Sequence, residues 1–114
     1  MIRDKLNNGF VVVRQDRDKA TFFDQNGEEM FQVSSIGAEN TEFSFYNFRN
    51  DSEVLVVHDK ARQKTSLYNA KGVPLLAQDL NASAPIGIIY YQSRGEYELF
   101  VNFANQMAIY NVAK

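Results

Sequence analysis

Short apolar segments alternate with turn residues along most of this chain. In EYELFVNF, at 96–103, the apolar residues from Tyr97 to Phe103 occupy every second position, as in a strand with one buried face. No segment keeps a helical period for more than about two turns. The pattern predicts an all-β fold with ten strands, at 10–15, 19–24, 29–34, 42–48, 53–58, 64–69, 74–79, 86–92, 97–103 and 106–112.

The connectors between these strands carry the residues that favour tight turns. They contain Asn8-Gly9, Asn26-Gly27, Asn50-Asp51, Lys71-Gly72 and Arg94-Gly95. Most connectors are short enough for hairpins, so neighbouring strands are expected to pair antiparallel.

The chain also repeats itself with a period of about 44 residues, which is typical of duplicated supersecondary units. Residues 45–59 align with 89–103 without a gap, and this alignment puts Tyr46 on Tyr90. The strands recur with a constant period although the loops between them differ in length, which indicates a repeat architecture.

The first predicted strand extends the repeat, because a shift of 44 residues puts Val11 on Leu55. A short phrase recurs as well: two apolar residues, then Asp or Asn, then glycine three positions later. It reads FFDQNG at 22–27 and LYNAKG at 67–72, and the last residues of the chain, IYNVAK, begin it again. We interpret the phrase as the last strand of one unit and the turn to the next.

Each complete unit holds four predicted strands, which is the size of a β-propeller blade. We expect blade-like repeats at 29–72 and 73–114, with their antiparallel sheets at 29–69 and 74–112. Residues 1–28 precede them as a leader and half a blade. The expected architecture is therefore about two and a half blades, a partial propeller.

The strand followed by x-x-[FLI]-[FY]-[DN]-x-x-G resembles the repeats of the broad PQQ-like β-propeller superfamily, in outline over 10–114. The resemblance implies a propeller fold. The chain has no tryptophan, so the Trp docking motif of quinone-dependent members is absent and quinone binding is not implied. A ten-stranded up-and-down barrel is the alternative fold, because ten hairpin-linked strands could also close on themselves.

Composition is that of one globular domain: 114 residues, 45% hydrophobic, with a formal charge of −2. This charge gives no reason to expect nucleic acid as a partner. The absence of cysteine excludes disulfides and thiolate chemistry. We predict no cofactor, no signal peptide and no membrane insertion, because no apolar run exceeds about four residues, and the cellular compartment is left open.

Few residues suggest chemistry, and we predict no enzymatic activity. His58, the only histidine, is interpreted as an exposed residue at the end of a strand. Asp24, Asn26 and Glu28 alternate as in a calcium loop, but the spacing of an EF-hand is missing and a hairpin turn explains them. The charged segments at 14–19 and 58–64 are interpreted as solvated hairpin tips. No catalytic or metal-binding residue is predicted.

Charge is distributed unevenly, since only five Asp, Glu, Lys or Arg residues lie in 72–114. That segment is rich in aromatic residues, so we expect both faces of its sheet to be buried. We predict self-association, or docking onto further blades of a parent protein, with Tyr90, Tyr91 or Phe100 as interface anchors.

Three functions are consistent with these observations. The first is a non-catalytic propeller-type interaction module, or a segment of a larger propeller protein, that binds a protein. The second is a ligand-binding or enzymatic propeller whose site is completed by further blades. The third is a small barrel that binds an apolar ligand.

Overall fold

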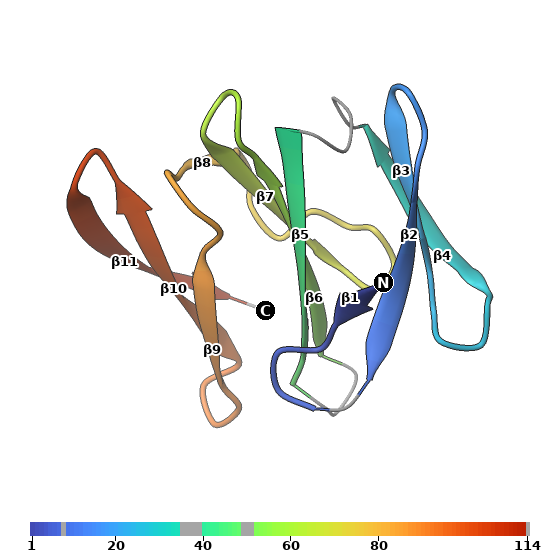
Figure 1. Ribbon diagram of the computed structural model, residues 1–114. Helices are drawn as coiled ribbons and strands as arrows, with labels where there is room; N and C mark the ends of the chain where they lie inside the picture. Colours follow the sequence, from blue (N-terminus) through green and yellow to red (C-terminus); the bar gives the residue numbers. More distant parts are fainter. Residues whose placement is uncertain (8, 35–39, 49–51, 114) are drawn as a thin grey trace.

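A computed structural model describes residues 1–7, 9–34, 40–48 and 52–113. The described residues form three antiparallel sheets and contain no α-helix (Figure 1). The expected all-β, antiparallel fold is confirmed. The predicted turns at Asn8-Gly9 and Asn50-Asp51 lie partly or wholly outside the described residues.

Each sheet is built from strands that follow one another in the chain. Sheet 1 has the order β1 (Ile2–Arg3), β2 (Phe10–Gln15), β3 (Lys19–Phe23) and β4 (Glu29–Ser34). Sheet 2 has the order β5 (Thr41–Asn47), β6 (Glu53–Asp59), β7 (Lys64–Asn69) and β8 (Leu80–Asn81). Sheet 3 has the order β9 (Gly87–Tyr91), β10 (Glu96–Phe103) and β11 (Gln106–Ala113).

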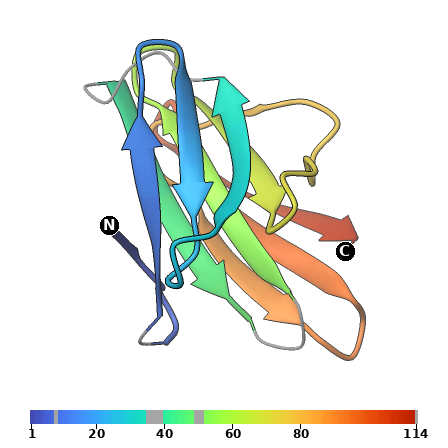
Figure 2. The same cartoon turned by 90° about the vertical axis from the view of Figure 1, so that its right-hand side faces the viewer.

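The three sheets pack face to face, with sheet 2 in the middle. In Figure 2 the strands of all three sheets lie over one another and slant in the same general direction. One apolar cluster lies between sheets 1 and 2, with Phe22 and Phe31 on one side and Phe45 and Leu55 on the other. Burying both faces of sheet 2 explains why β6 reads as an almost continuous apolar run.

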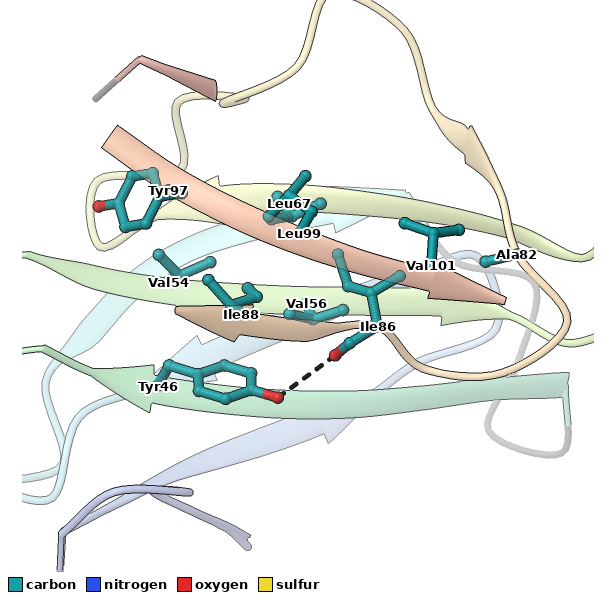
Figure 3. Packing of buried hydrophobic residues seen from close by; sticks show 10 residues of the cluster. All are labelled: Tyr46, Val54, Val56, Leu67, Ala82, Ile86, Ile88, Tyr97, Leu99 and Val101. Carbon is teal, nitrogen blue, oxygen red and sulfur yellow. Dashed lines mark hydrogen bonds between the residues drawn. The ribbon is translucent and has the colours of Figure 1, made fainter. Parts of the chain in front are cut away.

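A second apolar cluster lies between sheets 2 and 3 (Figure 3). Its buried members are Tyr46, Val54, Val56, Leu67, Ala82, Ile86, Ile88, Tyr97, Leu99 and Val101. The Tyr46 hydroxyl donates to the backbone carbonyl of Ile86 at 3.3 Å, which satisfies a polar atom inside this apolar layer.

Nine of the ten predicted strands lie on observed strands. The strand predicted at 74–79 is wrong, because the chain leaves the sheet after one bridge from Pro74 to Tyr68. Proline has no N–H to continue a ladder. Leu75 and Leu76 instead pack against the second apolar cluster. The pattern also missed β1 and β8, which have only two residues each.

The predicted membership of the sheets is wrong by one strand. The strand at 29–34 was expected to begin a sheet over 29–69, but it pairs with β3 and is the last strand of sheet 1. The reason is the connector: the turn at 24–27 is a tight hairpin, so β4 returns alongside β3. Sheet 2 therefore begins at β5, and the recurrent phrase marks a hairpin within a sheet rather than the passage to the next one.

The ten-stranded barrel is not what the described strands form, because they divide into three sheets. The order of strands within each sheet nevertheless follows the chain, as hairpin connectors require.

The sheets also depart from the constant shift of 44 residues. Val11 faces sheet 2, whereas Leu55 faces sheet 1, so the predicted equivalence of these residues is wrong. Val54 faces the following sheet as Val11 does, which makes the shift 43 residues here. A slip of one residue moves a side chain to the other face of its sheet.

A second slip separates Tyr46 from Tyr90. Tyr46 packs between sheets 2 and 3 as the partner of Val54 in the ladder. Val54 corresponds to Glu98, whose partner in the ladder is Ile89. The counterpart of Tyr46 is therefore Ile89, because eight residues lie between Ile89 and Glu98 but only seven lie between Tyr46 and Val54.

Candidate interaction site

The three residues expected to anchor an interface do not share one face. Tyr90 faces sheet 2, where its ring lies 5.0 Å from that of Tyr97 and 5.8 Å from that of Phe48. Tyr91 and Phe100 lie on the opposite face of sheet 3, which no described segment covers. Tyr90 therefore belongs to packing within the chain, and only the other two could contact a partner.

We call this uncovered surface the outer face of sheet 3. Ladder partners share a face, so their pairs define it. Its apolar members are Ile89, Phe100, Met107 and Ile109. The charge-poor third of the chain thus buries one face of its sheet, and the expectation that both faces are buried is wrong for the chain on its own.

The outer face of sheet 3 corresponds to the faces of sheets 1 and 2 that are covered by the next sheet. Ile109 pairs with Phe100, just as Leu67 pairs with Val56 and Phe22 pairs with Val13. Phe22 is 0% exposed and Leu67 is 2% exposed, whereas Ile109 is 57% exposed. The same structural position is therefore core in two sheets and surface in the third.

Sequence reasoning missed Ile89, Met107 and Ile109, although it found Phe100. The signal was present in the edge strand QMAIYNVA, which carries apolar residues at both odd and even positions and no charge. A strand with two apolar faces is expected to be buried on both of them. Met107 is 65% exposed and apolar but not aromatic, so it was not among the predicted aromatic anchors.

Charged and polar groups border the outer face at one end. The Tyr91 hydroxyl donates to Glu98 Oε1 at 3.2 Å, and this hydrogen bond to the carboxylate raises the pKa of Tyr91. The Arg94 guanidinium lies 4.2 Å from the Tyr91 ring centroid and 3.9 Å from Glu96 Oε2. Glu96 and Glu98 make this end of the face acidic.

The free edge of sheet 3 adjoins the same face. Sheets 1 and 2 each have a fourth strand beside β3 and β7, but no described strand lies beside β11. The edge of β11 therefore presents unpaired backbone groups over eight residues without a charge or a proline. Such edges favour association with other chains.

His58, interpreted from the sequence as exposed, is only 1% exposed, so that interpretation is wrong. Its Nδ1 atom forms a hydrogen bond of 2.8 Å with Thr65 Oγ1 on the neighbouring strand. Burial lowers the pKa of His58, and the carboxylates of Glu42 and Asp59 partly oppose this effect. A buried histidine bonded to a threonine is a packing residue and offers no surface for a substrate.

The hairpin interpretation of residues 24–27 is supported by hydrogen bonds. Asp24 Oδ1 accepts the backbone N–H groups of Asn26 at 2.9 Å and Glu28 at 3.0 Å. Gly27 has a positive φ of 84°, as a tight turn needs. The Asp24 carboxylate therefore serves the turn, which accounts for the residue types without a calcium ion.

Asn69 plays the same role in the second copy of the phrase. Its Oδ1 atom accepts the N–H groups of Lys71 at 2.9 Å and Val73 at 3.0 Å, and Gly72 has a φ of 82°. The phrase recurs because the Asp or Asn side chain and the glycine together build one turn.

A hollow of about 410 Å³ lies beside β1. It is lined by Met1, Ile2, Arg3, Asp4, Lys5, Val13 and Phe43. Asp4 is not free for chemistry there, because its Oδ1 atom accepts the N–H groups of Leu6 and Asn47 at 3.0 Å each. The bond from Asn47 ties the segment after β1 to sheet 2, so the carboxylate serves the junction between the sheets.

Within the described ranges, no group of three or more His, Asp or Glu side chains is placed to hold a metal ion. The same residues include no helix long and apolar enough to cross a membrane. Comparison with models of protein families, with curated proteins and with solved structures finds no match.

Proposed function

We propose that this chain is a non-catalytic protein-interaction module, built like part of a β-propeller, that binds a protein through the outer face of sheet 3. The observation that carries the proposal is the exposure of Ile109 at a position that is core in sheets 1 and 2. Residues that a solvent-facing sheet would make polar are apolar here.

Two further observations support a binding role over catalysis. His58 is buried and bonded to Thr65, and the Asp24 and Asp4 carboxylates are engaged by backbone N–H groups. The polar groups that could act as acids or bases thus serve the fold. The propeller comparison rests on the repeat and on consecutive antiparallel sheets that pack face to face.

Photo-cross-linking tests this function. A benzophenone amino acid at position 109 keeps the site apolar, and the same residue at position 71, an exposed turn of sheet 2, is the matched control. We expect a cross-linked protein product from position 109 in cells and much less from position 71. Equal yields from both positions would contradict a binding role for this face.

A further inference from the structure

We infer that the partner of the outer face of sheet 3 is a second copy of this chain, which docks with the outward face of its sheet 1. This inference rests on the proposed function and names the partner. The contact is head-to-tail, so each copy contributes sheet 3 to one contact and sheet 1 to another.

The outward face of sheet 1 corresponds to the faces through which sheets 2 and 3 each pack on the preceding sheet. Leu55 in sheet 2 and Leu99 in sheet 3 each face the preceding sheet and are fully buried. Their counterpart in β2 is Val12, which faces away from sheet 2 and is 38% exposed. Phe23, the ladder partner of Val12, lies beside it on the same face.

The two uncovered faces carry opposite charge. Sheet 1 presents Arg3, Arg14 and Lys19 on its outward face, against Glu29 on the same face and Asp16, whose Oδ2 lies 3.6 Å from Arg14 Nε. One positive charge remains in excess. The outer face of sheet 3 presents Glu96 and Glu98, against one cation, Arg94, so one negative charge remains in excess. Complementary charge favours contact between unlike faces and opposes contact between two copies of the same face.

The positions of opposite charge also correspond in space. Glu98 corresponds to Val54, which belongs to the same buried cluster as Tyr97 of the docked sheet. The Tyr97 hydroxyl bonds to Ser52, two residues before Val54. The counterpart of Tyr97 in sheet 1 is Phe10, whose ladder partner is Arg3. If sheet 1 of a second copy docks as sheet 3 docks on sheet 2, Arg3 comes to lie beside Glu98.

The size of the faces favours two simultaneous contacts. At about 3.3 Å per residue and about 4.8 Å between strands, each outer face covers roughly 300 Å² of sheet plane. One contact buries two such faces, roughly 600 Å², which is below the range of stable interfaces. A closed pair of chains has two contacts and buries roughly 1,200 Å², the lower end of that range.

Charge reversal on each face tests the head-to-tail arrangement. Glu98→Lys and Arg3→Glu are made in separate chains, and mass in solution is measured by light scattering for each variant and for their equimolar mixture. Each variant alone places like charges at its contacts, so we expect the chain mass, 13.0 kDa. The mixture restores an opposite pair at both contacts, so we expect twice that mass.

Glu28→Lys and Arg17→Glu are the matched controls, because they make the same changes in exposed hairpin turns. Both controls are expected to dimerise, and urea unfolding of every variant confirms that it folds. A monomeric wild type, or a dimer that Arg3→Glu leaves unchanged, overturns the inference. The second result would mean that two copies of sheet 3 face each other.

If the wild type is monomeric and position 109 cross-links to a different protein, the interaction function stands and only the second copy is excluded. If position 109 gives no product above the control, the function fails as well. The two experiments therefore separate the failure of the partner from the failure of the site.

Discussion

At the scale of single residues, several buried polar side chains are satisfied by close neighbours, whereas Thr21 Oγ1 is buried without a hydrogen-bond partner among the described residues. Ser52 Oγ and the Tyr97 hydroxyl form a hydrogen bond of 2.5 Å between sheets 2 and 3, and His58 bonds to Thr65 within sheet 2. Such bonds contribute little net energy, but leaving one partner unpaired costs about 1–3 kcal/mol. The Ser52–Tyr97 bond links sheet 3 to sheet 2, whereas the His58–Thr65 bond links β6 to β7 within sheet 2.

His58 is expected to make folding depend on pH. Its pKa in the folded chain is lowered by burial below the ordinary value of 6.5, so only the unfolded chain gains a proton as pH falls through that value. Stability contributed by neutral His58 is therefore full above about pH 6.5 and is lost as pH falls toward the lowered pKa, by no more than about 1.4 kcal/mol per pH unit.

Urea midpoints at about pH 7 and about pH 5 measure this effect in the wild type and in His58→Gln. The wild type should lose more stability between the two values than the variant, which cannot titrate at this position. An equal loss in both proteins would show that other groups cause the pH dependence.

At the scale of elements, the hairpin turns connect the sheets as well as the strands. Gly72 lies in the turn after β7, and a Cβ atom placed there would lie 2.7 Å from Cβ of Phe31 in sheet 1. Gly27 lies in the corresponding turn after β3 and has no neighbour within 4 Å of such an atom. The two glycines have nearly the same φ, so they separate backbone strain from packing.

Replacing each glycine by alanine exploits this difference. Gly27→Ala should cost about 1–2 kcal/mol, the penalty of a left-handed conformation. Gly72→Ala should cost about 1–3 kcal/mol more, because its Cβ collides with Phe31 and the two sheets must move apart. Urea unfolding gives both values, and equal losses would contradict close packing of this turn on sheet 1.

Strands could be predicted from the sequence because alternation and turn residues are local signals. Their assignment to sheets could not be predicted as well, since it depends on whether a connector such as 24–27 makes a hairpin or a passage between sheets. A gapless alignment of the repeats also does not reveal the one-residue slips at Val11 and Tyr46. They arise from turns that differ by one residue, yet they decide which face of a sheet each side chain occupies.

The burial of His58 could not be predicted either, because a histidine beside Asp59 at the end of a strand has the pattern of an exposed polar residue. Its burial depends on Thr65 from the next strand and on the sheet packed above. Of the predicted anchors, Tyr91 and Phe100 lie on the outer face, whereas Tyr90 lies on the covered one. Composition identifies aromatic residues, but only the ladder register assigns them to a face.

At the scale of the whole molecule, three sheets pack in sequence order and leave two outer faces. The face of sheet 3 is apolar with an acidic end, and the outward face of sheet 1 carries an excess of cations over an apolar strip. Head-to-tail contact would cover both with the packing that already holds sheets 2 and 3 together. The central claim is that the outer face of sheet 3 is a contact surface between copies of this chain.

Sedimentation equilibrium of the unmodified chain, beside Ile109→Lys, tests this claim most directly. The lysine places a charge at the centre of the contact, and position 109 is exposed within the chain, so the variant should fold with nearly unchanged stability. At tens of micromolar, where a small interface is expected to form, the account predicts twice the 13.0 kDa chain mass for the wild type and the single mass for the variant. A wild type that remains a 13.0 kDa monomer at this concentration would contradict it.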